Sequence, residues 1–495
     1  MNMSNAKHKL FNISEDEITR ILFAEDSECE DLILDEEDQE FLCEDVETVR
    51  GEVVIEDPEH NVTKVGQNKP LIQTDAPNEN VSSSLKKQSA KCKEKILKWE
   101  KTDSSKNVVT SSFPFSKVKI LYSDNPEPID IFERTCGFED LFKCVCDQSN
   151  LYMQQKGEAF ETYAEELKAF LGMNYVMGYH VLPSLRDYWS TQPDLQVPFI
   201  SNIMPRARFE KIRSALHFSD NSKILPRDDP EYDRAHKIRP LINHFNKYFQ
   251  DAREPSQCEA VDEHMIKFKG HSGMKQYIKN KPVKWGFKLW CRCDSETGYL
   301  YHFDLYTGKK KHSEKGLGES VVLQLCEPLQ GLGVRVFFDN FFNSPSLQID
   351  LLEKNILACG TVRGDRKGMP KNFMKDKDMK RGDIDFFSVQ GISCVKWMDT
   401  RAVLLLTNYI SPSEHVVVER RKSGSAEKMK VNCPAMVKYY NKYMGGVDLM
   451  DQLKSTYEVD RKSKIKYYLR IFFDLLDIAV NNAYIVYSQL QTESG

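Results

Sequence analysis

Two carboxylates stand three positions apart in the stretch Gly445-Gly446-Val447-Asp448-Leu449-Met450-Asp451-Gln452 of this 495-residue chain. In a helix, residues i and i+3 lie on one face, so Asp448 and Asp451 would point in the same direction. Much earlier, Asp262 lies in a strand-like apolar context, and Asp339 ends the apolar run Val334-Arg335-Val336-Phe337-Phe338. Site residues of an α/β sheet gather where strands end and helices begin, so we expect Asp262, Asp339 and Asp448 to converge.

Clustered carboxylates repel one another. A pair of unit charges ~4 Å apart costs about 1 kcal/mol in water and about 4 kcal/mol at an effective dielectric near 20. Such a cluster takes up protons or recruits cations, and Mg²⁺ prefers oxygen ligands. We therefore expect two Mg²⁺ or Mn²⁺ ions on Asp262, Asp339 and Asp448, with Asp451 as a further ligand or a supporting residue. Two ions about 3.5–4 Å apart would suit displacement at phosphorus. Taken singly, an Asp that follows a strand is usually a turn residue or a helix cap.

The net charge of −5 hides a strong segregation of charge along the chain. Residues 15–60 carry 20 Asp and Glu against Arg20 and Arg50, a local charge of −18, which leaves +13 on the remainder. An acidic tail on a basic body favours a nucleic-acid partner for the body. The alternative is a solubilising tail on an ordinary protein surface.

The 13 cysteines show no C-x-x-C pair, so we expect neither a disulfide framework nor a zinc site. The apolar segment from Ile471 to Tyr487 is interrupted by Asp474, Asp477, Asn481 and Asn482. This pattern predicts an amphipathic helix and no membrane partner.

The periodicity predicts a mixed α/β fold with six regions. Residues 1–125 form an acidic, largely disordered region, 126–258 a helical domain, 259–369 the first part of a sheet-based core, 370–432 a β-rich insertion, 433–457 the last part of the core, and 458–495 a helical segment. Helices are expected at Phe160–Leu171 and after Pro205. Alternating apolar residues predict strands in the core and at Ile384–Val389, Ser393–Met398, Ala402–Asn408 and His415–Glu419.

Basic residues interleave with aromatic ones from Tyr277 to Trp285 and again around Tyr467 and Tyr468. Lys and Arg give salt-dependent affinity for phosphates, and aromatic rings stack on unpaired bases. The predicted DNA-contacting residues are Lys281, Lys284, Arg363, Arg461, Lys462, Lys464 and Lys466. A solvated face with snorkelling side chains is the alternative.

Several motifs in a fixed order resemble piggyBac-type transposases and their domesticated derivatives. They are Val261-Asp262-Glu263, Tyr277-Ile278-Lys279-Asn280-Lys281-Pro282-Val283-Lys284-Trp285-Gly286-Phe287-Lys288, Phe338-Asp339-Asn340-Phe341-Phe342, Gly360-Thr361-Val362-Arg363 and Tyr443-Met444 followed by the Gly-Gly-Val-Asp stretch. The resemblance implies an RNase H-like catalytic core with a β-rich insertion and a flanking helical domain for dimerisation and DNA binding.

The resemblance further implies a catalytic triad of Asp262, Asp339 and Asp448, with Asp451 as the additional acidic position. The implied reaction is metal-dependent nicking, hairpin formation and strand transfer at TTAA sequences of double-stranded DNA in the nucleus, by a homodimer. One departure stands out. The family continues into further helix and a Cys-rich zinc-binding finger that do not occur in this sequence, so we expect no zinc here, and the resemblance leaves recognition of transposon ends and dimer formation open.

Three functions therefore compete. The first is a nuclear DNA-cleaving enzyme with an intact triad, and the second is a non-catalytic DNA- or chromatin-binding factor that keeps the old fold. The third acts through nuclear protein partners of the acidic tail, where Asp and Glu alternate with Ile, Leu and Phe.

Overall fold

A computed structural model of the chain describes residues 97–103, 117–119, 126–279, 281–308, 315–422, 426–456, 458–459 and 466–494. The predicted acidic, disordered region lies almost wholly outside these residues, as do Arg461, Lys462 and Lys464. No helix in the described ranges is long and apolar enough to cross a membrane.

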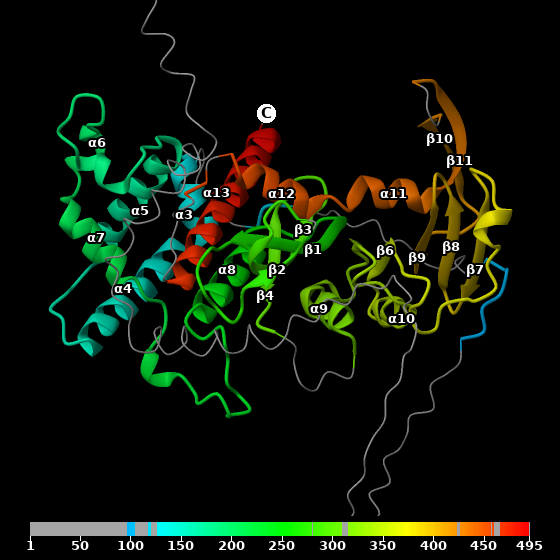
Figure 1. The fold of residues 1–495 in the computed structure, drawn as a ribbon, viewed down its shortest axis with the longest axis horizontal. Coiled ribbons are helices and arrows are strands. Elements are labelled where there is room, and N and C mark those ends of the chain that lie inside the picture. The colour runs from blue at the N-terminus through cyan, green and yellow to red at the C-terminus, as the bar shows by residue number, and fades with distance from the viewer. Residues whose placement is uncertain are drawn as a thin grey trace, which may run out of the picture.

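The first described helices form one end of the molecule (Figure 1). They are α3 (Pro128–Cys136), α4 (Phe138–Gln155), α5 (Ala164–Tyr179), α6 (Pro198–Ser201), α7 (Arg206–Ala215) and α8 (Arg239–Ala252), with the short 3₁₀ turns η2 (Leu185–Trp189) and η3 (Asn221–Lys223). Helix α7 starts directly after Pro205, as predicted. The prediction for α5 was shifted, because Asn150 on α4 hydrogen-bonds both backbone groups of Thr162 and so holds the preceding residues out of the helix.

A mixed sheet of nine strands forms the centre of the described structure, in the order β2-β3-β1-β5-β6-β9-β8-β7, with β4 also paired to β3. The strands of its first half are β1 (Cys258–Lys267), β2 (Gln276–Tyr277), β3 (Trp285–Asp294), β4 (Leu300–Leu305), β5 (Arg335–Phe338) and β6 (Leu357–Thr361). Strands β1, β5 and β6 run parallel, whereas β3 and β4 run antiparallel to their neighbours. This arrangement confirms the predicted mixed α/β, RNase H-like core.

The predicted β-rich insertion continues this sheet. Its strands are β7 (Ile384–Val389), β8 (Ile392–Met398), β9 (Ala402–Thr407), β10 (His415–Arg421) and β11 (Lys428–Pro434), preceded by the turn η5 (Asp376–Asp378). Strand β9 pairs with β6, so three insertion strands extend the core sheet, while β10 and β11 form a separate hairpin. The sequence pattern missed β2 and β11. In β11, Lys428, Met429, Lys430 and Asn432 are exposed and the last residues, with Val431, are buried, so apolar and polar residues do not alternate strictly.

Helices cover the core sheet on both faces (Figure 1). One layer contains α9 (Leu317–Leu325), the turn η4 (Glu327–Leu329) and α10 (Pro345–Glu353), and the other contains α11 (Ala435–Tyr443), α12 (Gly446–Lys454) and α13 (Tyr467–Ser494). Alternation along the strands sorts the side chains. Val261 and Phe338 pack with the α9 and α10 side chains, whereas Phe337 stacks near Tyr443 of α11.

Close backbone contact explains one of the glycines in the recognised motifs. A Cβ added at Gly360 on β6 would lie 2.1 Å from the Phe338 carbonyl oxygen, so this position accepts only glycine. The neighbouring Asn343 is fully buried and donates its side-chain amide to the Gly360 carbonyl at 2.9 Å. The segment after Asp339 is therefore tied to the adjacent strand.

The segment predicted as an amphipathic helix lies in helix α13, which is buried along most of its length. Its polar residues Asp474, Asp477 and Asn482 face inward and are paired. The Asn482 side chain exchanges two 2.9 Å hydrogen bonds with the backbone of Leu300 on β4. These polar side chains thus bind the helix to the sheet, at positions that the hydrophobic pattern alone predicts to be exposed to solvent.

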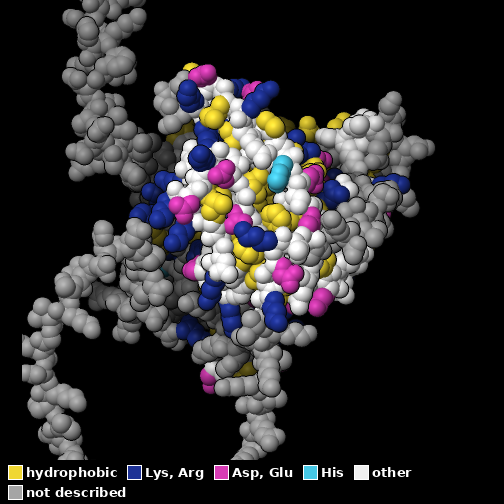
Figure 2. All heavy atoms as spheres, turned by 90° about the vertical axis from the view of Figure 1, so that its right-hand side faces the viewer, with side chains coloured by type: hydrophobic (Ala, Val, Ile, Leu, Met, Phe, Trp, Pro, Cys, Tyr) yellow, Lys and Arg dark blue, Asp and Glu magenta, His cyan; other side chains and the backbone are white. Residues whose placement is uncertain are grey.

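The surface at the insertion end carries no large region of one charge. Figure 2 shows Lys and Arg side chains interspersed with Asp, Glu and apolar side chains over this face. The residues drawn in colour there give this face a mixed charge.

Candidate active site

Asp262 lies within β1, and Asp339 directly follows the last residue of β5. The parallel register pairs Val261 with Phe338, the residues that precede the two Asp residues. Val261 and Phe338 pack with the α9 and α10 side chains, so continued alternation directs both carboxylates to the opposite face, which α11 and α12 cover. The register brings these two residues near each other, and their catalytic role stays a prediction.

Helix α12 brings Asp448 and Asp451 to the same face. Its first residue, Gly446, packs so closely on β1 that an added Cβ would lie 3.2 Å from the Cβ of Ala260. Ala260 and His264 flank Asp262 on this face, and the His264 ring contacts Asp451 at 2.6 Å. Asp262 therefore lies between two points at which β1 contacts α12. Asp448 is exposed in the first turn of the helix.

Two lysines supply positive charge to this acidic cluster. Lys281 lies within electrostatic range of Asp262, Glu263, Asp448 and Asp451, and its ammonium is 3.8 Å from a Glu263 carboxylate oxygen. Burial lowers the pKa of Lys281, but these four carboxylates outweigh burial and raise it. Lys288 on β3 lies 4.0 Å from Glu263. Lys281 is thus a built-in counter-charge of the carboxylates.

The pKa values of Asp262 and Asp339 are both raised. Burial, with Glu263 next to it, raises the pKa of Asp262 to about 8. Burial also raises the pKa of Asp339, against a 2.8 Å hydrogen bond that the Phe341 N–H donates to its carboxylate. Raised carboxyl pKa values are expected where acidic side chains are gathered without enough cation.

Behind the cluster runs a chain of buried ion pairs. The other ring nitrogen of His264, Nε2, lies 2.8 Å from Asp474 on α13, and Asp474 lies 2.8 Å from Lys454 at the end of α12. Burial lowers the pKa of His264, but Asp474 and Asp451 outweigh burial and raise it to about 9. Lys454 and His264 in turn hold the pKa of Asp474 well below its usual range, against the effect of burial.

The donor set fits the predicted divalent cations in kind. Asp262, Asp339 and Asp448 offer carboxylate oxygens, which Mg²⁺ and Mn²⁺ prefer over nitrogen or sulfur. In the described ranges, no three acidic, His or Cys side chains are arranged closely enough to hold a metal ion in this conformation. The metal ligand set of Asp262, Asp339, Asp448 and Asp451 stays a prediction.

The predicted DNA-contacting residues differ in their surroundings. Lys284 is exposed and directly precedes Trp285, whose largely exposed ring packs on that of Tyr277 with 4.7 Å between the ring centroids. Arg363 is also exposed, and its guanidinium donates to the side chain of Asn340. Lys281 points among the carboxylates.

Lys466 requires a correction. It is only 1% exposed, and its ammonium donates to the Ser214 carbonyl at 2.7 Å and lies over the Tyr152 ring. Tyr468 is fully buried as well, so neither side chain reaches a nucleic acid in this structure. Snorkelling, the alternative interpretation of this segment, does not describe them either. Both belong to the core that joins α13 to the helical domain.

Sequence reasoning missed three members of the cluster. Glu263 follows Asp262 directly and was quoted only as part of a motif. Tyr440 on α11 is electrostatically coupled to both Asp339 and Asp262. His264 forms ion pairs with residues of two distant helices, Asp451 on α12 and Asp474 on α13. Only its position two residues from Asp262 on the same strand face was a signal.

A model of the family described as Transposase IS4 matches residues 127–484, well over half of the chain. Human PiggyBac transposable element-derived protein 2 is 33% identical over 398 residues, which cover 78% of this chain and 66% of that protein. Human PiggyBac transposable element-derived protein 3 is 30% identical over 398 residues, with 79% and 66% covered. The chain therefore spans slightly less than two thirds of the length of these relatives.

Among solved structures, a piggyBac transposase synaptic complex with hairpin DNA, determined by cryo-EM, matches with a TM-score of 0.64. The identity is 24%, and the match covers 74% of this chain and 76% of that one, which supports the fold. Together with the order of the motifs and the RNase H-like sheet, these similarities show that the chain belongs to the piggyBac transposase family.

Proposed function

We propose that this protein binds double-stranded DNA and cleaves and rejoins its strands with a metal-dependent carboxylate site. The parallel register of β1 and β5 is the observation that carries the proposal, because it places Asp262 and Asp339 next to each other with α12 packed on the same face. The membership in a transposase family supports the class of reaction, and the solved relative in complex with hairpin DNA supports DNA as the substrate.

Each residue has a defined part in this proposal. Asp262 and Asp339 hold divalent cations from the sheet, Asp448 completes the set from the first turn of α12, and Asp451 orients or extends it. When bound, two such cations supply an activated water or 3′-hydroxyl and stabilise the leaving oxygen at phosphorus. Lys284 with the exposed Tyr277 and Trp285 binds the DNA backbone beside the site.

Nicking of a TTAA-containing duplex in the presence of Mg²⁺ tests the proposal. Asp339→Asn should abolish nicking, because the amide loses the charge that a cation needs, and it should weaken Mn²⁺ binding measured by electron paramagnetic resonance. Asp350→Asn is the matched control, since Asp350 lies on α10 in the opposite helix layer and pairs with Lys315. Nicking that survives Asp339→Asn refutes the mechanism.

A second candidate is a DNA- or chromatin-binding factor without catalysis. Lys281 favours it, because its ammonium balances the carboxylates without any metal. This candidate requires salt-dependent retention on DNA that Asp339→Asn leaves unchanged, together with no detectable Mn²⁺ binding by the wild type. A steep loss of DNA affinity between low and physiological salt would mark several phosphate contacts.

Further parts of the proposal concern location and partners. We place the protein in the nucleus, as a homodimer on TTAA-containing DNA, with nuclear proteins as partners of the acidic residues 15–60. Imaging of a tagged full chain tests the location, and sedimentation with and without DNA tests the dimer. Unchanged recovery of partners after deletion of residues 1–60 would exclude the acidic segment as their binding site.

A further inference from the structure

One histidine joins three elements that meet behind the carboxylate cluster. His264 lies on β1, and its Nδ1 is 2.6 Å from Asp451 on α12 while its Nε2 is 2.8 Å from Asp474 on α13. His264 and Asp474 are both buried. The ring therefore bridges a carboxylate of α12 and a carboxylate of α13.

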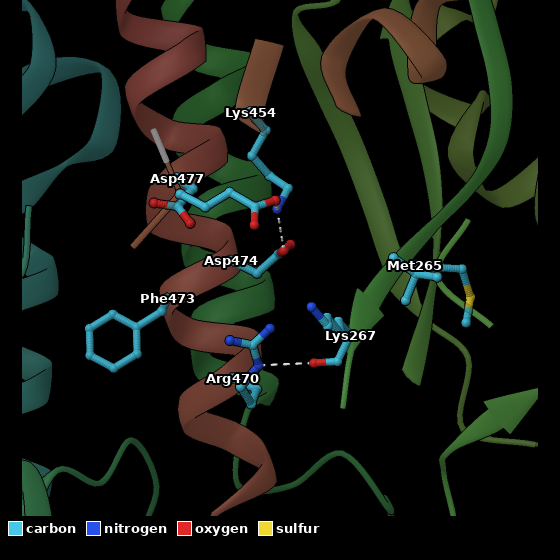
Figure 3. Close-up of a pocket in the computed structure, with 9 residues that line it drawn as sticks. Met265, Lys267, Lys454, Arg470, Phe473, Asp474 and Asp477 are labelled. Carbon is cyan, nitrogen blue, oxygen red and sulfur yellow. Dashed lines mark hydrogen bonds and ion pairs between the residues drawn. The ribbon is translucent and has the colours of Figure 1, made fainter. Parts of the chain in front are cut away.

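Asp474 is the hub of this arrangement, because it contacts α12 in two ways. It reaches Asp451 through the His264 ring, and it pairs directly with Lys454, which lies one helical turn further along α12. Figure 3 shows Lys454 and Asp474 facing each other across the gap between α12 and α13. Helix α12 is thus held at two successive turns by one carboxylate of α13.

The ion pair between Lys454 and Asp474 borders a cavity. The cavity has a volume of about 130 Å³ and is lined by these two side chains and, among others, by Met265, Lys267 and Arg470 (Figure 3). On this side the two side chains meet open space, so their 2.8 Å ion pair is a contact that orients both.

The orientation of Asp451 follows from the same contact. Its Oδ1 is buried 2.6 Å from His264 Nδ1 in an ion-pair contact that lacks hydrogen-bond geometry, and the side chain as a whole is 38% exposed, so its exposed part lies away from His264. Lys281, which is coupled to Asp262 and Asp448, is coupled to Asp451 as well. The exposed part of Asp451 therefore faces Lys281 and the other carboxylates of the cluster.

We propose that His264 and Asp474 act as positioning residues, which we call the α12 clamp: they fix Asp451, and with it the helix that carries Asp448, against β1. The inference deepens the proposed DNA cleavage and rests on it for its functional meaning. Supporting residues that orient metal ligands typically change metal affinity by about 10- to 100-fold when they are replaced. The α12 clamp belongs to this class of residues.

The test measures Mn²⁺ binding by electron paramagnetic resonance, together with nicking as a function of Mg²⁺ concentration. His264→Gln keeps one hydrogen-bonding group but no charge, and Asp474→Asn removes the α13 charge without altering any proposed ligand. Both should weaken Mn²⁺ affinity about 10- to 100-fold. Both should raise the Mg²⁺ concentration for half-maximal nicking more than they lower the maximal rate. His244→Gln on α8 is the matched control and should change neither quantity.

Additivity provides the decisive comparison. His264→Gln combined with Asp451→Asn should weaken Mn²⁺ binding little more than Asp451→Asn alone, because the clamp acts through Asp451. Fully additive losses, or unchanged metal affinity in both clamp variants, overturn the inference. If His264→Gln does not fold, Asp474→Asn alone decides it by the same affinity measurement.

The two proposals fail in different ways. A wild type that neither nicks nor binds Mn²⁺ refutes the proposed cleavage. In that case a cycle of unfolding equilibria for His264→Gln and Asp451→Asn still decides whether the clamp exists. A coupling of about tenfold in the unfolding constant supports the clamp, and independent effects of the two substitutions overturn it.

Discussion

Replacing Gly446 by alanine tests how α12 is seated on the sheet. A Cβ at this position would lie 2.8 Å from the Asp294 carbonyl oxygen and 3.1 Å from the Cα of Ser295, both of them backbone atoms that cannot turn aside. Ordinary contact begins near 3.4 Å, so the start of α12 must move by about 0.6 Å. Forcing an additional methyl group into a packed contact costs about 1–3 kcal/mol.

The displacement also affects the candidate site, because Asp448 lies two residues after Gly446 in the first turn. A misplacement of about 1 Å can reduce catalysis by about 10²-fold, so we expect nicking to fall by about 10-fold. The assays are denaturant-induced unfolding for stability and Mg²⁺-dependent nicking of a TTAA duplex for function.

Gly445→Ala is the matched control, since a Cβ there has no atom within 4 Å. Gly445 occupies the N-cap of α12, where alanine is less suitable than glycine, so a loss of up to about 1 kcal/mol is expected. The reasoning is refuted if Gly446→Ala is as stable and as active as Gly445→Ala. That result would mean that α12 does not pack on β1 as closely as described.

Three further predictions concern charged side chains, buried and exposed. Burial raises the pKa of Asp477 to about 8, so its carboxyl destabilises the fold progressively as pH rises from about 4 to about 8. Asp477→Asn keeps an acceptor for the Val459 N–H. This substitution should therefore raise the melting temperature more at pH 8 than at pH 5. Lys281→Met leaves the carboxylates without their counter-charge, so thermal unfolding without metal should occur at lower temperature and Mg²⁺ should protect the variant more than the wild type; equal protection would contradict the role of Lys281. Lys284→Ala should reduce the slope of DNA affinity against salt concentration by about one phosphate contact. Lys466→Ala should lower stability without changing that slope. DNA binding at several salt concentrations measures the slope of each variant.

Local patterns located most of the core elements correctly. The predicted strand Ile384–Val389 has the bounds that the structure shows, and the helix predicted after Pro205 begins at Arg206. These features depend on residues that are close in sequence, so they can be predicted from the sequence alone. Strand β2 spans two residues, too few for any period to show.

The pattern failed where charged residues are buried. Lys466, Asp474 and Asp477 have the composition of a solvated helix face, yet each lies inside the molecule. Their partners, such as Ser214, His264 and the backbone of Val459, come from other elements, and no local period identifies them. A buried charge is stable only through such partners, so its burial cannot be inferred before the partners are placed.

The chain alone singled out Asp262, Asp339 and Asp448 as a predicted set, because the motifs around them occur in a recognisable order. It also established the alternation of strands and helices that makes a mixed sheet. Folding settled the rest: the parallel register that sets Asp262 beside Asp339, the insertion of Lys281 among the carboxylates, and the His264 bridge from Asp451 to Asp474. The physical reason is that electrostatic contacts act over a few ångströms in space, and residues far apart along the chain reach that distance only once sheet and helices have packed.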